Sequence, residues 1–77
     1  MDLRVLLELS RYLLRAVTSR PADTKVEHIH SGGVDFLFLE VAKPDQKALS
    51  ERDKDALVLV LERIGKKLGR EVIVDWR

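Results

Sequence analysis

The chain has 77 residues, with 14 lysines and arginines against 13 aspartates and glutamates, and its formal net charge is +1. This length predicts one domain, and the near-neutral charge gives no long-range attraction to nucleic acid or to an anionic membrane. The absence of cysteine excludes a disulfide scaffold, thiol catalysis and cysteine-ligated zinc, and favours a cytoplasmic location. Charged residues interrupt the leucine-rich start, which therefore fits neither a signal peptide nor a membrane span.

A helix is predicted over residues 2–18 by the period of the apolar residues, and Pro21 lies just beyond its end. At 100° per residue, one group of apolar side chains falls on a single side and is expected to face the core: Val5, Leu6, Leu9, Tyr12, Leu13, Ala16 and Val17. Leu3, Leu7 and Leu14 widen the apolar arc beyond what packing on one sheet needs. We therefore expect these three leucines to be available to a partner.

The apolar period then changes to two, which is typical of strands. The segments KVEHIH (25–30) and VDFLFLEV (34–41) flank Gly32 and Gly33, which can supply the positive φ angles of a hairpin turn. Both sides of the second segment are apolar, so it is expected to be a central strand. The first segment is more polar and is expected to lie at an edge of the sheet.

A long helix is predicted to begin after Ser50, which forms a capping-box pattern with Asp53, and to end at Gly69. Its expected core stripe contains Leu57, Val60, Leu61, Ile64 and Leu68. Gly65 inside this helix indicates a close backbone contact, either within the chain or with a partner. With a short helical turn after Pro44 and a last strand in EVIVDW, the order is α-β-β-(short α)-α-β. This order predicts an α+β two-layer sandwich, a three-stranded sheet covered by two helices.

The leucine-rich first helix, the Gly-Gly hairpin, the Pro44-Asp45 turn and the closing GREVIVDW occur in an order that resembles the type II KH domain. The resemblance covers nearly the whole chain and is in particular to small bacterial proteins made of little more than one such domain. It implies a single KH-like domain over residues 1–77. It implies a Gly-x-x-Gly loop that grips the backbone of single-stranded nucleic acid. At that place the chain has Ser50, Glu51, Arg52 and Asp53, with no glycine and two acids. These residues fit a helix N-terminus better than a phosphate clamp.

His28 and His30 lie two residues apart and point to the same side of the first strand. Asp35 is the one nearby candidate for a further metal ligand, and it faces His30 if the turn has two residues; a three-residue turn places Val34 there instead. Two histidines alone are weak evidence for zinc, so we expect a partly exposed strand face and no metal site. No serine has a base placed by local spacing, so no catalytic residue, cofactor or small-molecule substrate is expected.

We therefore expect a non-catalytic interaction module that acts through protein contacts, self-association included. The residues expected to make these contacts are Leu3, Leu7, Leu14, Val58, Leu59 and Trp76. The alternative is an RNA-binding protein with a degenerate KH motif, with contacts from Arg52, Lys54, Arg63 and Lys67. The near-neutral net charge and the acids Glu51 and Asp53 favour the protein partner, because both weaken attraction to phosphates.

Overall fold

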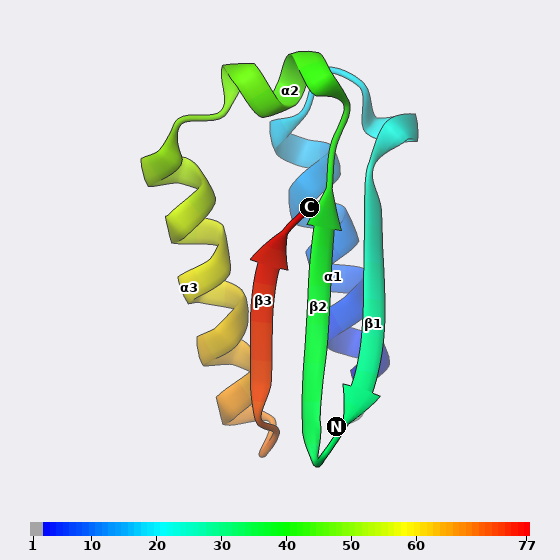
Figure 1. The fold of residues 1–77 in the computed structure, drawn as a ribbon, viewed down its shortest axis with the longest axis vertical. Coiled ribbons are helices and arrows are strands. Elements are labelled where there is room, and N and C mark those ends of the chain that lie inside the picture. Colours follow the sequence, from blue (N-terminus) through cyan, green and yellow to red (C-terminus); the bar gives the residue numbers. More distant parts are fainter. Residues whose placement is uncertain (1–2) are drawn as a thin grey trace.

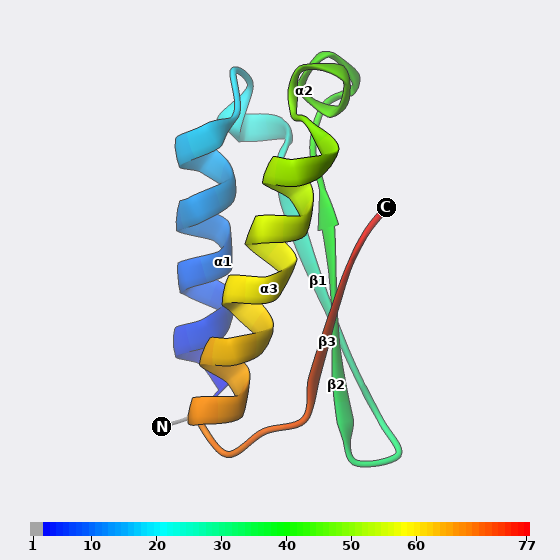
Figure 2. The same ribbon diagram turned by 90° about the vertical axis from the view of Figure 1, so that its left-hand side faces the viewer.

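The computed structural model describes residues 3–77, which form two layers. The elements in chain order are α1 (Leu3–Val17), a 3₁₀ turn η1 (Pro21–Asp23), β1 (Lys25–Ser31), β2 (Val34–Glu40), α2 (Lys43–Ala48), α3 (Glu51–Lys67) and β3 (Val72–Trp76). The three strands lie in front of α1, with α3 beside β3 (Figure 1), and the view turned by 90° shows both long helices on the same side of the sheet (Figure 2). The predicted α+β sandwich is confirmed. None of the helices within residues 3–77 is long and apolar enough to cross a membrane.

The sheet has the order β1-β2-β3, with β1 antiparallel and β3 parallel to the central strand. Gly32 and Gly33 have φ angles of 59° and 78° and form a two-residue turn, so His30 pairs with Asp35 and Ser31 with Val34. Antiparallel strands can be joined by such a turn, whereas the parallel pair needs a long crossover, which α2 and α3 supply. The predicted edge position of β1 and central position of β2 are both confirmed.

The core lies between the sheet and the two long helices. Alternate side chains of the central and last strands point into it, and they meet leucines from α1 and α3. The buried apolar residues are Leu3, Leu6, Leu14, Leu37, Leu39, Val41, Leu61, Val72 and Val74. The strand β1 adds only the half-buried Val26 to this cluster. The histidines of β1 therefore occupy positions on the helix-facing side where an interior strand would carry apolar residues.

The opposite face of the sheet is not covered by any element within residues 3–77 (Figure 2). Phe36 and Phe38 of the central strand stack there with their ring centroids 6.4 Å apart. The guanidinium of Arg77 lies 5.0 Å from the centre of the Phe38 ring, and Ile73 is exposed beside them. The acids Glu27, Glu40 and Asp75 also lie on this open face, with Lys25 opposite Glu40.

The orientation of α1 differs from the sequence-based expectation. Its buried residues are Leu3, Leu6, Ser10 and Leu14, whereas Val5, Tyr12 and Val17 are exposed. Ser10 lies in the core because its hydroxyl donates a 2.7 Å hydrogen bond to the carbonyl of Leu6. The sequence-based expectation assumed that the middle of the wide apolar arc of α1 faces the core. In the structure α1 lies beside α3, and one edge of that arc packs against the sheet. Leu3 and Leu14 are therefore core residues, and their assignment to a partner surface is wrong.

The helix α3 begins and ends as the sequence predicts. The Ser50 hydroxyl accepts a 3.0 Å hydrogen bond from the Asp53 backbone N–H and so caps the first turn, and Gly69 follows the helix with a φ of 77°. Of the expected core stripe, Leu61 is buried but Val60 is exposed. Gly65 is buried against β3, where an added Cβ atom would lie 2.5 Å from Cγ2 of Val72. The close contact expected at this glycine is therefore internal.

Asp45 of α2 connects the short helix to the end of α1. Its buried carboxylate accepts hydrogen bonds from the Ser19 backbone N–H and hydroxyl, both at 2.8 Å, and from the Arg20 backbone N–H at 3.2 Å. The backbone N–H of Ser19 lowers the pKa of Asp45 most; burial acts in the opposite direction, and the other two donors and the charge of Arg20 lower it further. The net pKa lies below the ordinary value of 3.8.

This arrangement predicts an acid-dependent stability difference between the wild type and an Asp45→Asn variant. The folded-state pKa of Asp45 is below its unfolded value, so the stability that its ionised form contributes is complete above 3.8 and is lost as the pH falls through the folded pKa. We expect Asp45→Asn to lower Tm at neutral pH and the difference to shrink in acid. Thermal unfolding followed by circular dichroism from neutral pH to about pH 2 measures this difference. Asp55→Asn, on an exposed part of α3, is the control; a Tm difference at Asp45 that does not change with pH would contradict the assignment.

Candidate functional site

The outer helical face is the side of the helix layer that points away from the sheet (Figure 2). An apolar groove lies between the two long helices, with lining residues from α1, from α3 and from Leu49 before the Ser50 cap. We name it the α1–α3 groove. Its volume is about 490 Å³ and its lining residues are Leu13, Val17, Leu49, Asp53, Ala56, Leu57 and Val60. Val17 and Val60 are both large apolar side chains that remain exposed. Asp53 is the only charged residue of the lining.

The groove exists because each long helix has more apolar surface than the sheet can cover. The core side of α1 centres on Ser10, and that of α3 centres on Leu61 and Gly65. The apolar arc of each helix is wider than the part that packs on the sheet. The side chains at the outer edge of that arc face the neighbouring helix or the solvent. On α1 the surplus continues along the outer face as Val5, Leu9, Tyr12 and Ala16.

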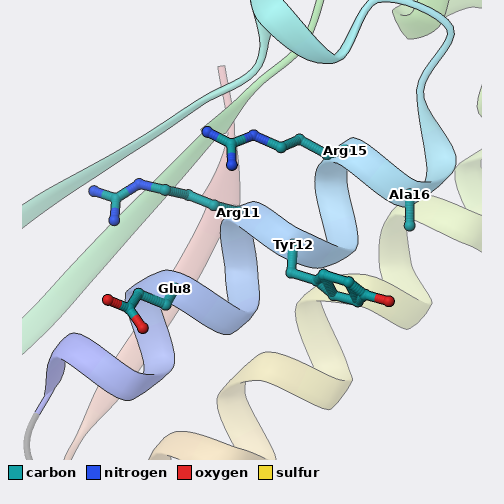
Figure 3. A pocket seen from close by; sticks show the side chains of 5 residues that line it. All are labelled: Glu8, Arg11, Tyr12, Arg15 and Ala16. Carbon is teal, nitrogen blue, oxygen red and sulfur yellow. The ribbon is translucent and has the colours of Figure 1, made fainter.

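Basic residues lie at the two borders of the outer helical face, on the far side of each helix, and none of them lines the groove itself. On the far side of α1 lie Arg4, Arg11 and Arg15, with Glu8 among them, and on the far side of α3 lie Arg52, Arg63 and Lys67; all are exposed. Figure 3 shows a shallow hollow along α1, where the guanidinium groups of Arg11 and Arg15 extend in a common direction and Tyr12 points away from them. The outer helical face therefore combines an apolar centre with a predominantly positive border.

The structure does not bring together the residues predicted from sequence to contact a partner. Leu3 and Leu14 are in the core, and three more are half-buried and pack against it: Leu7, Val58 and Trp76. Leu59 is exposed, but it lies on the other side of α3, in a hollow lined mainly by charged residues. Leu13, Val17, Leu57 and Val60, which line the groove, were expected in the core. The sequence pattern shows that each helix has a wide apolar arc, but not which edge of that arc the sheet covers.

Three of the four residues predicted to contact RNA share one side of α3. Arg52, Arg63 and Lys67 are exposed there, whereas Lys54 lies half-buried on the opposite side. The ammonium of Lys54 is 3.7 Å from the Glu51 carboxylate, and its carbonyl accepts a 3.2 Å hydrogen bond from the Trp76 indole. Lys54 is therefore separated from the other three.

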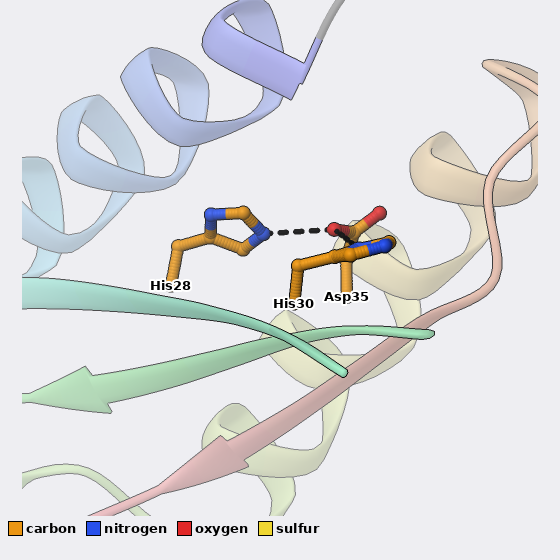
Figure 4. Close-up of side chains that lie close together, drawn as sticks. All are labelled: His28, His30 and Asp35. Atoms are coloured by element: carbon orange, nitrogen blue, oxygen red, sulfur yellow. Dashed lines mark hydrogen bonds and ion pairs between the residues drawn. The ribbon is translucent and has the colours of Figure 1, made fainter. Parts of the chain in front are cut away.

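A second cluster lies on the helix-facing side of the sheet near the hairpin (Figure 4). One oxygen of Asp35, Oδ1, lies 2.8 Å from Nε2 of His28 and 2.8 Å from Nδ1 of His30. The other oxygen, Oδ2, accepts a 3.0 Å hydrogen bond from the Arg70 guanidinium. The Asp35 side chain is buried, His28 is partly exposed, and the His30 side chain is 57% exposed. We name these four residues the Asp35 cluster.

The charge of Asp35 is stabilised by its neighbours. Burial raises the pKa of Asp35, but hydrogen bonds with His28, His30 and Arg70, together with the charge of Arg70, lower it more. The net pKa lies well below the ordinary 3.8, so the carboxylate is ionised at neutral pH. The pairing of His30 with Asp35 follows from the predicted turn, whereas Arg70 is 35 residues from Asp35 in sequence and no local pattern indicates it.

The two features lie in different parts of the fold. The α1–α3 groove opens on the outer helical face, whereas the Asp35 cluster lies between the sheet and the helix layer, at the hairpin end.

Comparison of the chain with protein-family models, curated proteins and solved structures gives no match.

Proposed function

We propose that this chain is a non-catalytic interaction module that binds an acidic amphipathic helix of a partner protein in the α1–α3 groove. The observation that carries the proposal is the apolar groove on an outer helical face that has basic residues on the far side of each helix. Amphipathic helices bind such grooves through apolar side chains spaced i, i+3 or i+4, and i+7. Flanking acids of the partner would then lie near the arginines and lysines.

The apolar lining supplies the affinity in this proposal. Val17 and Val60 are exposed to water in the free protein. Fully burying a side chain of this size from water contributes about 1.5–3 kcal/mol. Val17 and Val60 are 45% and 46% exposed, so burying the remainder of each contributes about half of that and offsets part of the cost of association. Leu13 and Leu57 form the more buried part of the lining, where a partner side chain would pack.

The border charges select the class of partner. A second copy of this chain would bring its own Arg11, Arg15 and Lys67 against the same basic borders, and like charges placed face to face oppose association. A helix with glutamates beside its apolar stripe replaces this repulsion with attraction. We therefore propose a partner helix, and not a second copy of this chain, as the molecule bound in the groove. The experiments below also detect self-association, which the sequence allows.

A KH-like fold is part of the same proposal, and its support is the α-β-β-α-α-β order over residues 3–77. The loop that would clamp phosphates in a KH domain is replaced here by the Ser50 cap, with Glu51 and Asp53 in the first turn of α3. We propose that the binding surface is the outer helical face instead, and that the module acts in the cytoplasm.

Isothermal titration calorimetry with a synthetic helix tests the proposal. The probe is an amphipathic peptide of about five turns, with leucines at the i, i+3, i+4 and i+7 positions and glutamates beside them, and the control peptide has lysines in place of the glutamates. We expect low-micromolar binding, about −7 to −8 kcal/mol, for the glutamate peptide, with weaker binding at high salt and for the lysine peptide. Equal binding of the two peptides would contradict the assigned role of the basic borders.

A pair of matched protein variants locates the binding surface. Val60 in the groove is 46% exposed and Ile73 on the open sheet face is 42% exposed, so aspartate at either position leaves the core intact. We expect Val60→Asp to weaken peptide binding at least about tenfold, or roughly 1.4 kcal/mol, and Ile73→Asp to leave it unchanged. The opposite pattern would place the site on the sheet.

Two other outcomes would replace the proposed partner. A concentration-dependent dimer in sedimentation that Val60→Asp dissociates would make a second copy the occupant. The shared side of Arg52, Arg63 and Lys67 favours RNA as the remaining candidate. Salt-sensitive binding of labelled single-stranded RNA that is lost in the Arg63→Glu, Lys67→Glu double variant, but kept in Val60→Asp, would make RNA the ligand.

A further inference from the structure

The Asp35 cluster brings together three side chains that can ligate a metal ion. Nε2 of His28, Nδ1 of His30 and a carboxylate oxygen of Asp35 all lie within 4.8 Å of one another. Both imidazoles approach the same oxygen, Oδ1, at 2.8 Å. Zinc bound at about 2.0–2.1 Å by tetrahedral ligands needs donor atoms about 3.3 Å apart. Side-chain rotations that lengthen each contact by roughly half an ångström would therefore open a position for an ion.

The surroundings of these donors suit a bound cation. The Asp35 carboxylate is buried between both histidines, and a carboxylate ligand supplies negative charge to a divalent ion. His30 is exposed, which gives an ion access from solvent. The regular strand backbone fixes the spacing of His28 and His30, and the hairpin register fixes Asp35 opposite His30. The three donors are therefore held by rigid elements and by a two-residue turn.

Arg70 occupies the carboxylate oxygen that an ion would not need. Its guanidinium bonds Oδ2 at 3.0 Å, whereas both histidines share Oδ1. Groups that hydrogen-bond a ligating carboxylate or imidazole fix its orientation and contribute to metal affinity. The positive charge of Arg70 also opposes a second cation nearby, and we therefore expect affinity below that of a site with four protein ligands.

We propose that His28, His30 and Asp35 bind one divalent transition-metal ion, with Zn²⁺ as the representative ion and water or a partner group completing the coordination. Two imidazoles and one carboxylate are a ligand set found in zinc and in non-haem iron sites that keep open positions. Imidazole donors select such ions over Mg²⁺ and Ca²⁺, which prefer oxygen ligands. This site is independent of the α1–α3 groove, so either proposal can fail without the other.

Titration of the full chain with ZnCl₂ in competition with a chromophoric chelator tests the site. We expect one equivalent to bind with a Kd in the micromolar range, a rise in Tm on saturation, and no response to Mg²⁺. Replacing Zn²⁺ with Co²⁺ gives a second readout, because a low-coordinate site of nitrogen and oxygen ligands produces visible absorption bands that hexaaqua cobalt lacks.

Alanine variants connect the binding to the named residues. We expect His28→Ala and His30→Ala each to weaken Zn²⁺ binding at least about tenfold, while circular dichroism shows the fold retained, because both side chains are partly exposed at an edge strand. Glu27→Gln, on the other face of the same strand, is the matched control and should bind like the wild type. No saturable binding by the wild type, or unchanged binding in the His28→Ala, His30→Ala double variant, would overturn the proposal and leave the cluster as an ion-pair network.

Discussion

Replacing Leu14 with alanine is expected to lower the free energy of unfolding by about 2–5 kcal/mol, as for other fully buried leucines. The Leu14 side chain is 1% exposed and belongs to the core cluster between α1 and the sheet. A domain of this length has a total stability of about 4–12 kcal/mol, so the loss is a large part of the whole. Urea denaturation followed by circular dichroism measures it.

Tyr12→Ala is the matched control on the same helix. Tyr12 is 66% exposed, and we expect its replacement to change the free energy of unfolding by no more than about 0.5 kcal/mol. The sequence pattern alone predicts the reverse, because it places Tyr12 on the core side and Leu14 at a partner surface. A larger loss for Tyr12→Ala than for Leu14→Ala would mean that α1 is rotated differently from the structure described here.

Gly65→Ala is expected to destabilise the protein by about 1–3 kcal/mol, although alanine is the better helix former. The added methyl group would lie 2.5 Å from Cγ2 and 2.8 Å from Cβ of Val72, and neither atom is the end of a flexible side chain. Helix α3 or strand β3 must therefore move to accept it. Chemical denaturation of the variant measures the loss, and Lys66→Ala, on the exposed side of the same turn, is the control.

A double-mutant cycle with Val72→Ala separates this steric effect from other causes. Val72→Ala removes the Cγ2 atom but keeps Cβ, so the double variant should recover part of the loss, and the two changes should not be additive. Without steric contact at this position, helix propensity would dominate and Gly65→Ala would gain about 1 kcal/mol. That gain, or full additivity in the cycle, would contradict the close packing of α3 on β3.

Much of the fold follows from local sequence patterns. The two-residue turn follows from Gly32 and Gly33, the start of α3 from Ser50 with Asp53, and the central position of β2 from apolar residues on both of its sides. Each of these patterns acts over a few residues, so it is visible without knowing the rest of the chain. The element order then restricts the architecture, because two amphipathic helices and a three-stranded sheet pack in few ways.

The functional surfaces depend on contacts that local patterns do not contain. The apolar arc of α1 is wide enough to fit two orientations, and the choice between them depends on where α3 lies over the sheet. Val60 has the helical spacing of a core residue, yet it faces the groove. Arg70 meets Asp35 only because the crossover through α3 brings the start of β3 beside β2. The groove and the full Asp35 cluster therefore required the three-dimensional arrangement.

An NMR titration of the ¹⁵N-labelled protein with the glutamate-bordered amphipathic peptide shows residue by residue whether the groove is the binding surface. We predict that amide shifts concentrate at the groove, on Leu13, Val17, Ala56 and Val60, and that residues of the open sheet face such as Phe36 and Ile73 do not respond. Shifts concentrated on the sheet face, or no shifts at peptide concentrations well above micromolar, would contradict binding of an acidic amphipathic helix between α1 and α3.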